Sequence, residues 1–125
     1  MSTAGGPPTI VVIEDDADIA ELVEGILSDS GHALSIRSGL GEGPADLDVR
    51  LVITDLVAFR SYDRDDARDW VSRVRARYPR AAVAVATAHS GAAQDGAPAL
   101  GADAVLTKPY DIDLFTKTVE SLLDR

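Results

Sequence analysis

Five side chains in this sequence combine the groups that would bind a cation and a phosphoryl group. They stand at the ends of four apolar runs, and they are Glu14, Asp15, Asp55, Thr87 and Lys108. Three carboxylates packed together repel one another unless a cation lies among them. Oxygen ligands without Cys or His suit Mg²⁺, and a lysine and a hydroxyl opposite them suit a phosphoryl group. One carboxylate can then act as a nucleophile and become an aspartyl phosphate.

Each of these residues also has an ordinary structural explanation when it is taken alone. The acidic run Glu14-Asp15-Asp16 favours the N-terminus of a helix, where the macrodipole stabilises negative charge. Thr87 would be a strand-end hydroxyl bonded to backbone, and Lys108 a solvated lysine before a turn. The functional interpretation therefore depends on the coincidence of these residues at successive strand ends.

The elements that must position these groups begin with five runs of strand length. We predict strands at residues 9–13, 33–37, 51–54, 81–88 and 104–107. Leu51, Val52 and Ile53 are apolar on both faces, which is typical of a strand in the middle of a parallel sheet. The carboxyl ends of parallel strands meet at one edge, where open α/β sheets bind ligands.

Amphipathic helices are predicted between these strands. A stripe at helical spacing covers residues 17–30, with Asp16 as N-cap and Gly31 as stop, and consists of Ile19, Leu22, Val23, Ile26 and Leu27. A helix that begins at Asp66 or Asp69 carries Trp70, Val71, Val74 and Tyr78 and ends before Pro79. At that spacing Trp70 is interpreted as core and not as a platform for a ligand. Asp111 or Asp113 caps a last helix with the apolar face Leu114, Phe115, Val119, Leu122 and Leu123.

Two connections are poor in helix signals. Gly39, Gly41, Gly43 and Pro44 leave room for at most a shortened second helix, and Gly91, Gly96 and Pro98 predict a short or mobile fourth helix. Five strand–helix units predict a single α/β domain with a parallel sheet wound on both faces.

Composition limits the classes of function. The 125 residues suffice for one domain at 9–125, and residues 1–8 are predicted to be a flexible tail. There is no cysteine, hence no disulfide and no thiolate zinc site. A net charge of −9 argues against direct binding of nucleic acid, and no run is long enough to span a membrane. We expect a cytoplasmic protein.

The order of the motifs resembles the receiver domain of two-component response regulators. The resemblance extends over residues 9–123 and is carried by Ile13-Glu14-Asp15-Asp16, Leu51-Val52-Ile53-Thr54-Asp55, Thr87-Ala88, Gly101-Ala102-Asp103 and Lys108-Pro109. It implies a flavodoxin-like sheet with strand order 2-1-3-4-5.

The same resemblance assigns roles to the residues. It implies that Asp55 accepts a phosphoryl group from a histidine kinase or a histidine phosphotransfer protein. Asp15, Asp55 and the backbone carbonyl of Val57 would bind Mg²⁺, with Glu14 reaching the metal through water. Thr87 and Lys108 would contact the phosphoryl group. The implied protein is a signalling switch for a protein output partner and not an enzyme in the usual sense.

The sequence departs from the pattern where receivers report phosphorylation. Ala58 and Phe59 stand where Met-Pro is usual, and Val105 stands where an aromatic is usual. The family also places residues beside the path of the hydrolytic water two positions after the phosphoacceptor and two after the threonine, which are here Val57 and His89.

Two alternatives follow from these departures. A receiver-like module could bind its partner without phosphorylation, which the altered loop after Asp55 favours. A Mg²⁺-dependent phosphohydrolase with an aspartate nucleophile would usually carry a second acid where Val57 stands, so it ranks last. The sequence is equally compatible with a stand-alone receiver and with one domain of a longer protein.

Overall fold

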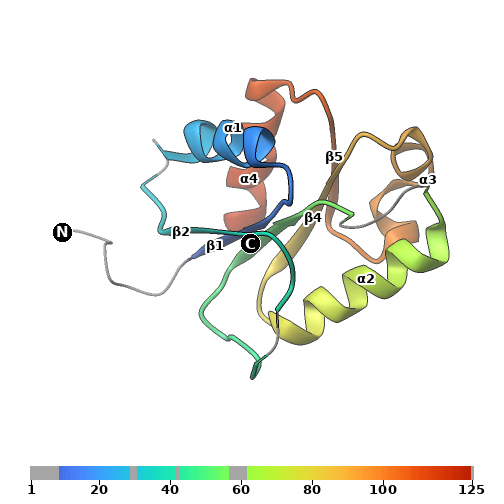
Figure 1. The fold of residues 1–125 in the computed structure, drawn as a ribbon, viewed down its shortest axis with the longest axis horizontal. Helices are drawn as coiled ribbons and strands as arrows, with labels where there is room; N and C mark the ends of the chain where they lie inside the picture. Colours follow the sequence, from blue (N-terminus) through green and yellow to red (C-terminus); the bar gives the residue numbers. More distant parts are fainter. Residues whose placement is uncertain (1–8, 29–30, 42, 57–61, 125) are drawn as a thin grey trace.

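Strands and helices alternate along most of the chain (Figure 1). The computed structural model describes residues 9–28, 31–41, 43–56 and 62–124. Within these residues the elements are β1 Ile10–Ile13, α1 Ala17–Leu27, β2 Leu34–Arg37, β3 Leu51–Thr54, α2 Arg64–Arg77, β4 Ala82–Thr87, α3 Ser90–Leu100, β5 Ala104–Thr107 and α4 Ile112–Leu123. The predicted flexible tail at 1–8 lies outside the described residues.

The five strands form one parallel sheet in the order β2-β1-β3-β4-β5. Ile13 pairs with Thr54, and Thr87 pairs with Thr107, so the strands end at nearly the same level. The predicted α/β class and strand order are confirmed. Every residue of β1 and β3 is buried, as their continuous apolar sequences predict for central strands.

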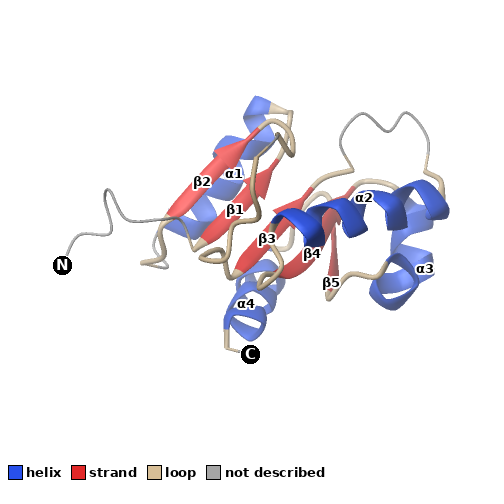
Figure 2. Cartoon of the chain, turned by 90° about the horizontal axis from the view of Figure 1, so that it is seen from below, coloured by secondary structure: helices blue, strands red, loops and turns tan. Residues whose placement is uncertain are grey.

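Alternate side chains of the strands enter two separate cores, one on each face of the sheet. Helices α1 and α4 cover one face, and α2 and α3 lie on the other side (Figures 1 and 2). Ile10 and Val12 pack toward Phe115 and Val119 on the first face. Val11 joins the second core, which contains all four apolar residues predicted for α2, namely Trp70, Val71, Val74 and Tyr78.

The connection between β2 and β3 contains bends but no helix in its described residues. The shortened second helix expected there is absent, because Gly41 and Gly43 adopt φ values of 70° and 143°, outside the helical region. Val49 and the partly buried Leu40 fill the core on the α2 side instead. The guanidinium of Arg77 donates to the carbonyl of Pro44, which ties this connection to the end of α2.

Three boundaries or faces differ from the sequence prediction. Helix α2 begins at Arg64, with Asp63 accepting from the backbone N–H of Asp66, so neither Asp66 nor Asp69 is its cap. Leu22 and Leu114 were expected on buried helix faces but are 48% and 59% exposed. Both lie at the edge of the apolar face of their helix, where side chains no longer point toward the sheet.

The fourth helix of the sequence prediction, expected to be short or mobile, corresponds to α3, and its backbone is interrupted. The helix spans Ser90–Leu100, but Gly96 has φ 81° and ψ 165°, which interrupts the helical backbone before Pro98. Only glycine adopts such a conformation without strain. The first half of α3, residues 90–95, is therefore a separate helical segment.

Candidate functional site

The polar residues singled out in the sequence lie at the carboxyl edge of the sheet. Strand pairing continues into them through backbone hydrogen bonds. Asp55 donates its N–H to Ile13 (2.9 Å), Glu14 donates to Arg37 (2.8 Å) and Lys108 donates to Thr87 (3.0 Å). Because these residues are fixed by the sheet itself, their side chains start from rigid positions.

Three carboxylates meet at this edge. Glu14, Asp15 and Asp55 each offer an oxygen within 4.8 Å of the oxygens of the other two. Glu14 is buried, Asp55 is partly buried and Asp15 is exposed, so the group opens to solvent on the side of Asp15. The neighbouring Asp16 has a different task, because its Oδ1 accepts from Asp18 and Ile19 and caps α1 as predicted.

The ammonium group of Lys108, the residue after β5, offsets part of this negative charge. Its Nζ lies 2.7 Å from Oε1 of Glu14 and 3.4 Å from Oδ1 of Asp55. The side chain of Lys108 is only 13% exposed, so both ion pairs are shielded from water. A backbone N–H from Leu56 adds a further donor to Oδ1 of Asp55 at 2.8 Å.

Burial raises the pKa of Glu14 above its usual value. Lys108 acts in the opposite direction, while the nearby Asp55 raises the pKa further. The pKa of Tyr110, which follows Lys108-Pro109, is raised mainly by burial and further by the charges of Glu14 and Asp55. Among the described residues, three carboxylates thus face one lysine at this edge.

Thr87 is buried at the end of β4, and its Oγ1 accepts the backbone N–H of His89 at 3.0 Å. The strand-end hydrogen bond that the sequence offered as the ordinary explanation is therefore present. The hydroxyl proton can still be donated to another acceptor. His89 follows at the N-cap position of α3 and makes no capping hydrogen bond through its side chain.

The donor set fits Mg²⁺, which takes a few carboxylate oxygens and retains water. Glu14, Asp15 and Asp55 provide only oxygen ligands, and the exposed side of the group leaves access for water. The predicted ligand Val57 lies outside the described residues.

Two tyrosines near the site were not singled out from the sequence. Tyr110 packs on Phe115 with ring centroids 4.9 Å apart, next to the acids that raise its pKa. Tyr62 lies within the polar connection after Asp55, and its hydroxyl donates to Oδ2 of Asp95 at 2.5 Å. An aromatic in a connection that follows a candidate site residue was the available signal for both, although Tyr62 shares its connection with Phe59.

No helix in the described residues is both long enough and apolar enough to cross a bilayer.

Comparisons with known proteins agree on one architecture. No family model matches the sequence, and no curated protein matches it significantly. Among solved structures, a response regulator receiver protein from Burkholderia phymatum is similar with 28% identity and a TM-score of 0.71, covering 94% of this chain and 96% of that one.

Two further structures extend the likeness. A receiver domain protein from Clostridium thermocellum has 23% identity and a TM-score of 0.70, with 95% and 96% of the two chains covered. A response regulator from Thermotoga maritima has 19% identity and a TM-score of 0.71, with 94% and 98% covered. This chain thus has the fold of a response-regulator receiver domain, and over most of its length it is similar to proteins of that class.

Proposed function

We propose that this protein is the phosphoacceptor receiver of a two-component phosphorelay, with Asp55 as the residue that is phosphorylated. The donor would be a phosphohistidine on a histidine kinase or a histidine phosphotransfer protein. The phosphorylated form would then switch a contact with a protein output partner in the cytoplasm.

The reaction needs a carboxylate oxygen to attack phosphorus. Asp55 would form the new O–P bond as the P–N bond of phosphohistidine breaks, and the released imidazole nitrogen would take up a proton from solvent. Lys108 would stabilise the charge on the transferred group as a point charge, and Thr87 would donate its hydroxyl proton to it.

One observation carries this proposal above the others. The Nζ of Lys108 lies 3.4 Å from Oδ1 of Asp55 and is also paired with Glu14 at 2.7 Å. A cation held by the buried Glu14 and the partly buried Asp55 is poised to donate to an incoming phosphoryl oxygen with little reorganisation.

Bound Mg²⁺ would supply charge neutralisation for the transferred group. Asp15 and Asp55 would hold it directly, Glu14 would do so through water, and the carbonyl of Val57 would complete the set. The mutual repulsion expected among the three carboxylates supports a need for such a cation.

Intact mass after treatment with a small phosphodonor and Mg²⁺ tests the assignment. The protein should gain one phosphate, and Asp55→Asn should gain none while its circular dichroism is unchanged. Asp48→Asn is a matched control on an exposed acid in the β2–β3 connection, and it should be phosphorylated like the parent protein.

The same experiment separates the alternatives. A parent protein that takes up no phosphate but still binds a partner would support the phosphorylation-independent module. Continuous release of inorganic phosphate from many phosphoesters would support a phosphohydrolase. Full incorporation into Asp55→Asn would assign the acceptor to another residue.

A further inference from the structure

The contact between Tyr62 and the first half of α3 joins two segments that both emerge from the candidate site. Tyr62 lies seven residues after Asp55, and residues 90–95 begin three residues after Thr87. The tyrosine hydroxyl donates to Oδ2 of Asp95 at 2.5 Å. Its ring is tilted 33° to that of His89, with centroids 6.4 Å apart.

The ring of Tyr62 also lies directly on the backbone of Gly91. A Cβ atom placed on Gly91 would lie 2.6 Å from Cδ2 and 3.1 Å from Cε2 of the tyrosine ring. Any residue with a Cβ atom at this position would collide with the ring where it now lies. Glycine is unfavourable inside a helix by roughly 1 kcal/mol relative to alanine, and here it permits close approach of Tyr62.

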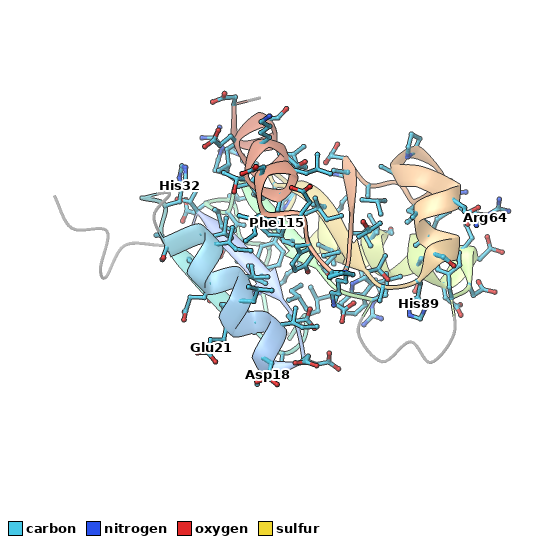
Figure 3. All side chains as sticks on the ribbon, turned by 90° about the horizontal axis from the view of Figure 1, so that it is seen from above. Asp18, Glu21, His32, Arg64, His89 and Phe115 are labelled. Carbon is cyan, nitrogen blue, oxygen red and sulfur yellow. The ribbon has the colours of Figure 1, made fainter. Side chains whose placement is uncertain are left out.

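The other end of residues 90–95 is a break in the helix. Gly96 has non-helical dihedral angles, and Ala97 and Pro98 begin a separate turn that leads to the left-handed Gly101. The first half of α3 is thus not continued rigidly into the second. Figure 3 shows His89, at the start of this segment, on the same end of the molecule as Arg64 at the start of α2.

At its beginning, this segment is tied to the candidate site by one hydrogen bond, from the N–H of His89 to Oγ1 of Thr87. A rotation of the Thr87 side chain about χ1 that carries Oγ1 toward a group on Asp55 would take this acceptor away from His89. The N-cap residue has no capping side chain to replace it. The contact with Tyr62 then remains, together with the packing of the buried Ala92 in the core.

We propose that Tyr62 clamps residues 90–95 to the start of α2, that Gly96 is the hinge of this segment, and that its release is how the state of Asp55 reaches the surface. The clamp stands on the contacts of Tyr62 alone, whereas the coupling to Asp55 rests on the proposed function. In this chain the aromatic residue that responds to the site would therefore be Tyr62, which contacts α3. The corresponding position in β5 holds the partly buried Val105, which is not aromatic.

Amide hydrogen exchange of the unphosphorylated protein tests the clamp by itself. Tyr62→Phe removes one hydrogen bond of about 1 kcal/mol, so exchange in residues 90–95 should become roughly fivefold faster. Tyr110→Phe is the matched control, because it removes a hydroxyl from the other partly buried tyrosine and should leave residues 90–95 unchanged. Equal exchange in Tyr62→Phe and the parent protein would overturn the clamp.

A glycine pair adds a second, independent test. Gly91→Ala should displace the Tyr62 ring and accelerate exchange in residues 90–95, whereas Gly25→Ala in α1, where an added Cβ meets nothing within 4 Å, should not. In a Tyr62→Ala background, Gly91→Ala should instead slow exchange, because only its helix propensity remains. Acceleration in both backgrounds would show that Gly91 serves another contact.

The coupling is tested with a beryllofluoride complex and Mg²⁺. A rise in melting temperature measures binding. Binding should accelerate exchange in residues 90–95 of the parent protein, and Asp55→Asn should show neither the rise nor the acceleration. Binding without a change in residues 90–95 would overturn the coupling but leave the proposed function standing. Absence of binding would contradict the proposed function and the coupling together, while the result for Tyr62→Phe would still decide the clamp.

Discussion

The indole N–H of Trp70 donates a hydrogen bond of 2.9 Å to the hydroxyl oxygen of Thr54, the last residue of β3. Thr54 in turn donates to the carbonyl of Asp55 at 2.7 Å. Both side chains are buried, so neither group can exchange its partner for water. A core residue of α2 therefore helps to fix the backbone from which the candidate nucleophile projects.

Removal of either partner should be costly, and removal of both should be less costly than the sum. Trp70→Phe and Thr54→Val each leave a buried polar group without this partner, which costs about 1–3 kcal/mol. The double variant should show a favourable coupling of about 1 kcal/mol. Urea unfolding gives these values, and it must be followed by circular dichroism because Trp70 is the only tryptophan. Strictly additive losses would contradict the importance of this hydrogen bond.

The sheet and the location of the site could be predicted from the sequence because both follow from local signals. Leu51, Val52 and Ile53 are apolar without alternation, which only a central strand accommodates. Once the strands are parallel, Asp55 and Lys108 must reach the same edge. That shared edge was predicted without knowledge of loops or helices, whereas the 3.4 Å ion pair between the two side chains is seen only in the structure.

The start of α2 could not be predicted in the same way. Asp63, Asp65, Asp66 and Asp69 are all chemically suitable caps within seven residues, and local preference does not choose among them. Asp63 is the N-cap in the structure, and the ring of the preceding Tyr62 packs on Gly91 of α3, a helix far away in the sequence. Such a long-range contact leaves no periodic signal in the sequence.

Magnesium should stabilise the folded protein through the three carboxylates. At ten times its dissociation constant the ion adds about 1.4 kcal/mol, or roughly 5 °C in melting temperature. Asp15→Asn should lose this rise, whereas the exposed Asp18→Asn in the first turn of α1 should keep it. Differential scanning calorimetry at constant ionic strength measures both. An equal rise in Asp15→Asn would mean that the cation acts only by screening the net charge.

The stabilising effect of Tyr62 should disappear in alkaline solution. Loss of contact with water, and then the hydrogen bond to Asp95, raise the pKa of Tyr62 from 10.0 to about 12. Because the folded protein binds this proton more tightly, the contribution is complete below pH 10 and is lost as the pH rises through 12. The difference in urea midpoint between the parent protein and Tyr62→Phe should therefore shrink across this range. A difference in urea midpoint that stays constant from pH 8 to pH 12 would contradict the role given to the hydroxyl proton of Tyr62.

Two neighbouring residues at the start of α4 should differ sharply in their contribution to stability. The periodic pattern placed Leu114 and Phe115 together on the buried face, but Leu114 is 59% exposed and Phe115 only 1%. Periodicity gives the direction of an apolar face and not its width. The buried strip of α4 consists of Phe115, Val119 and Leu122, and Leu123 is partly buried beside it.

Phe115→Ala should therefore cost about 3–5 kcal/mol, because it leaves a cavity beneath Tyr110 and between α4 and the sheet. Leu114→Ala should change the free energy of unfolding by no more than about 0.5 kcal/mol, as is usual for exposed positions. Its backbone N–H still donates to Oδ1 of Asp111, so the cap of α4 is kept and the side chain alone is tested. Urea unfolding of both variants measures the difference. A loss of several kcal/mol in Leu114→Ala would mean that this side chain is covered in solution, as the apolar pattern of the sequence first indicated.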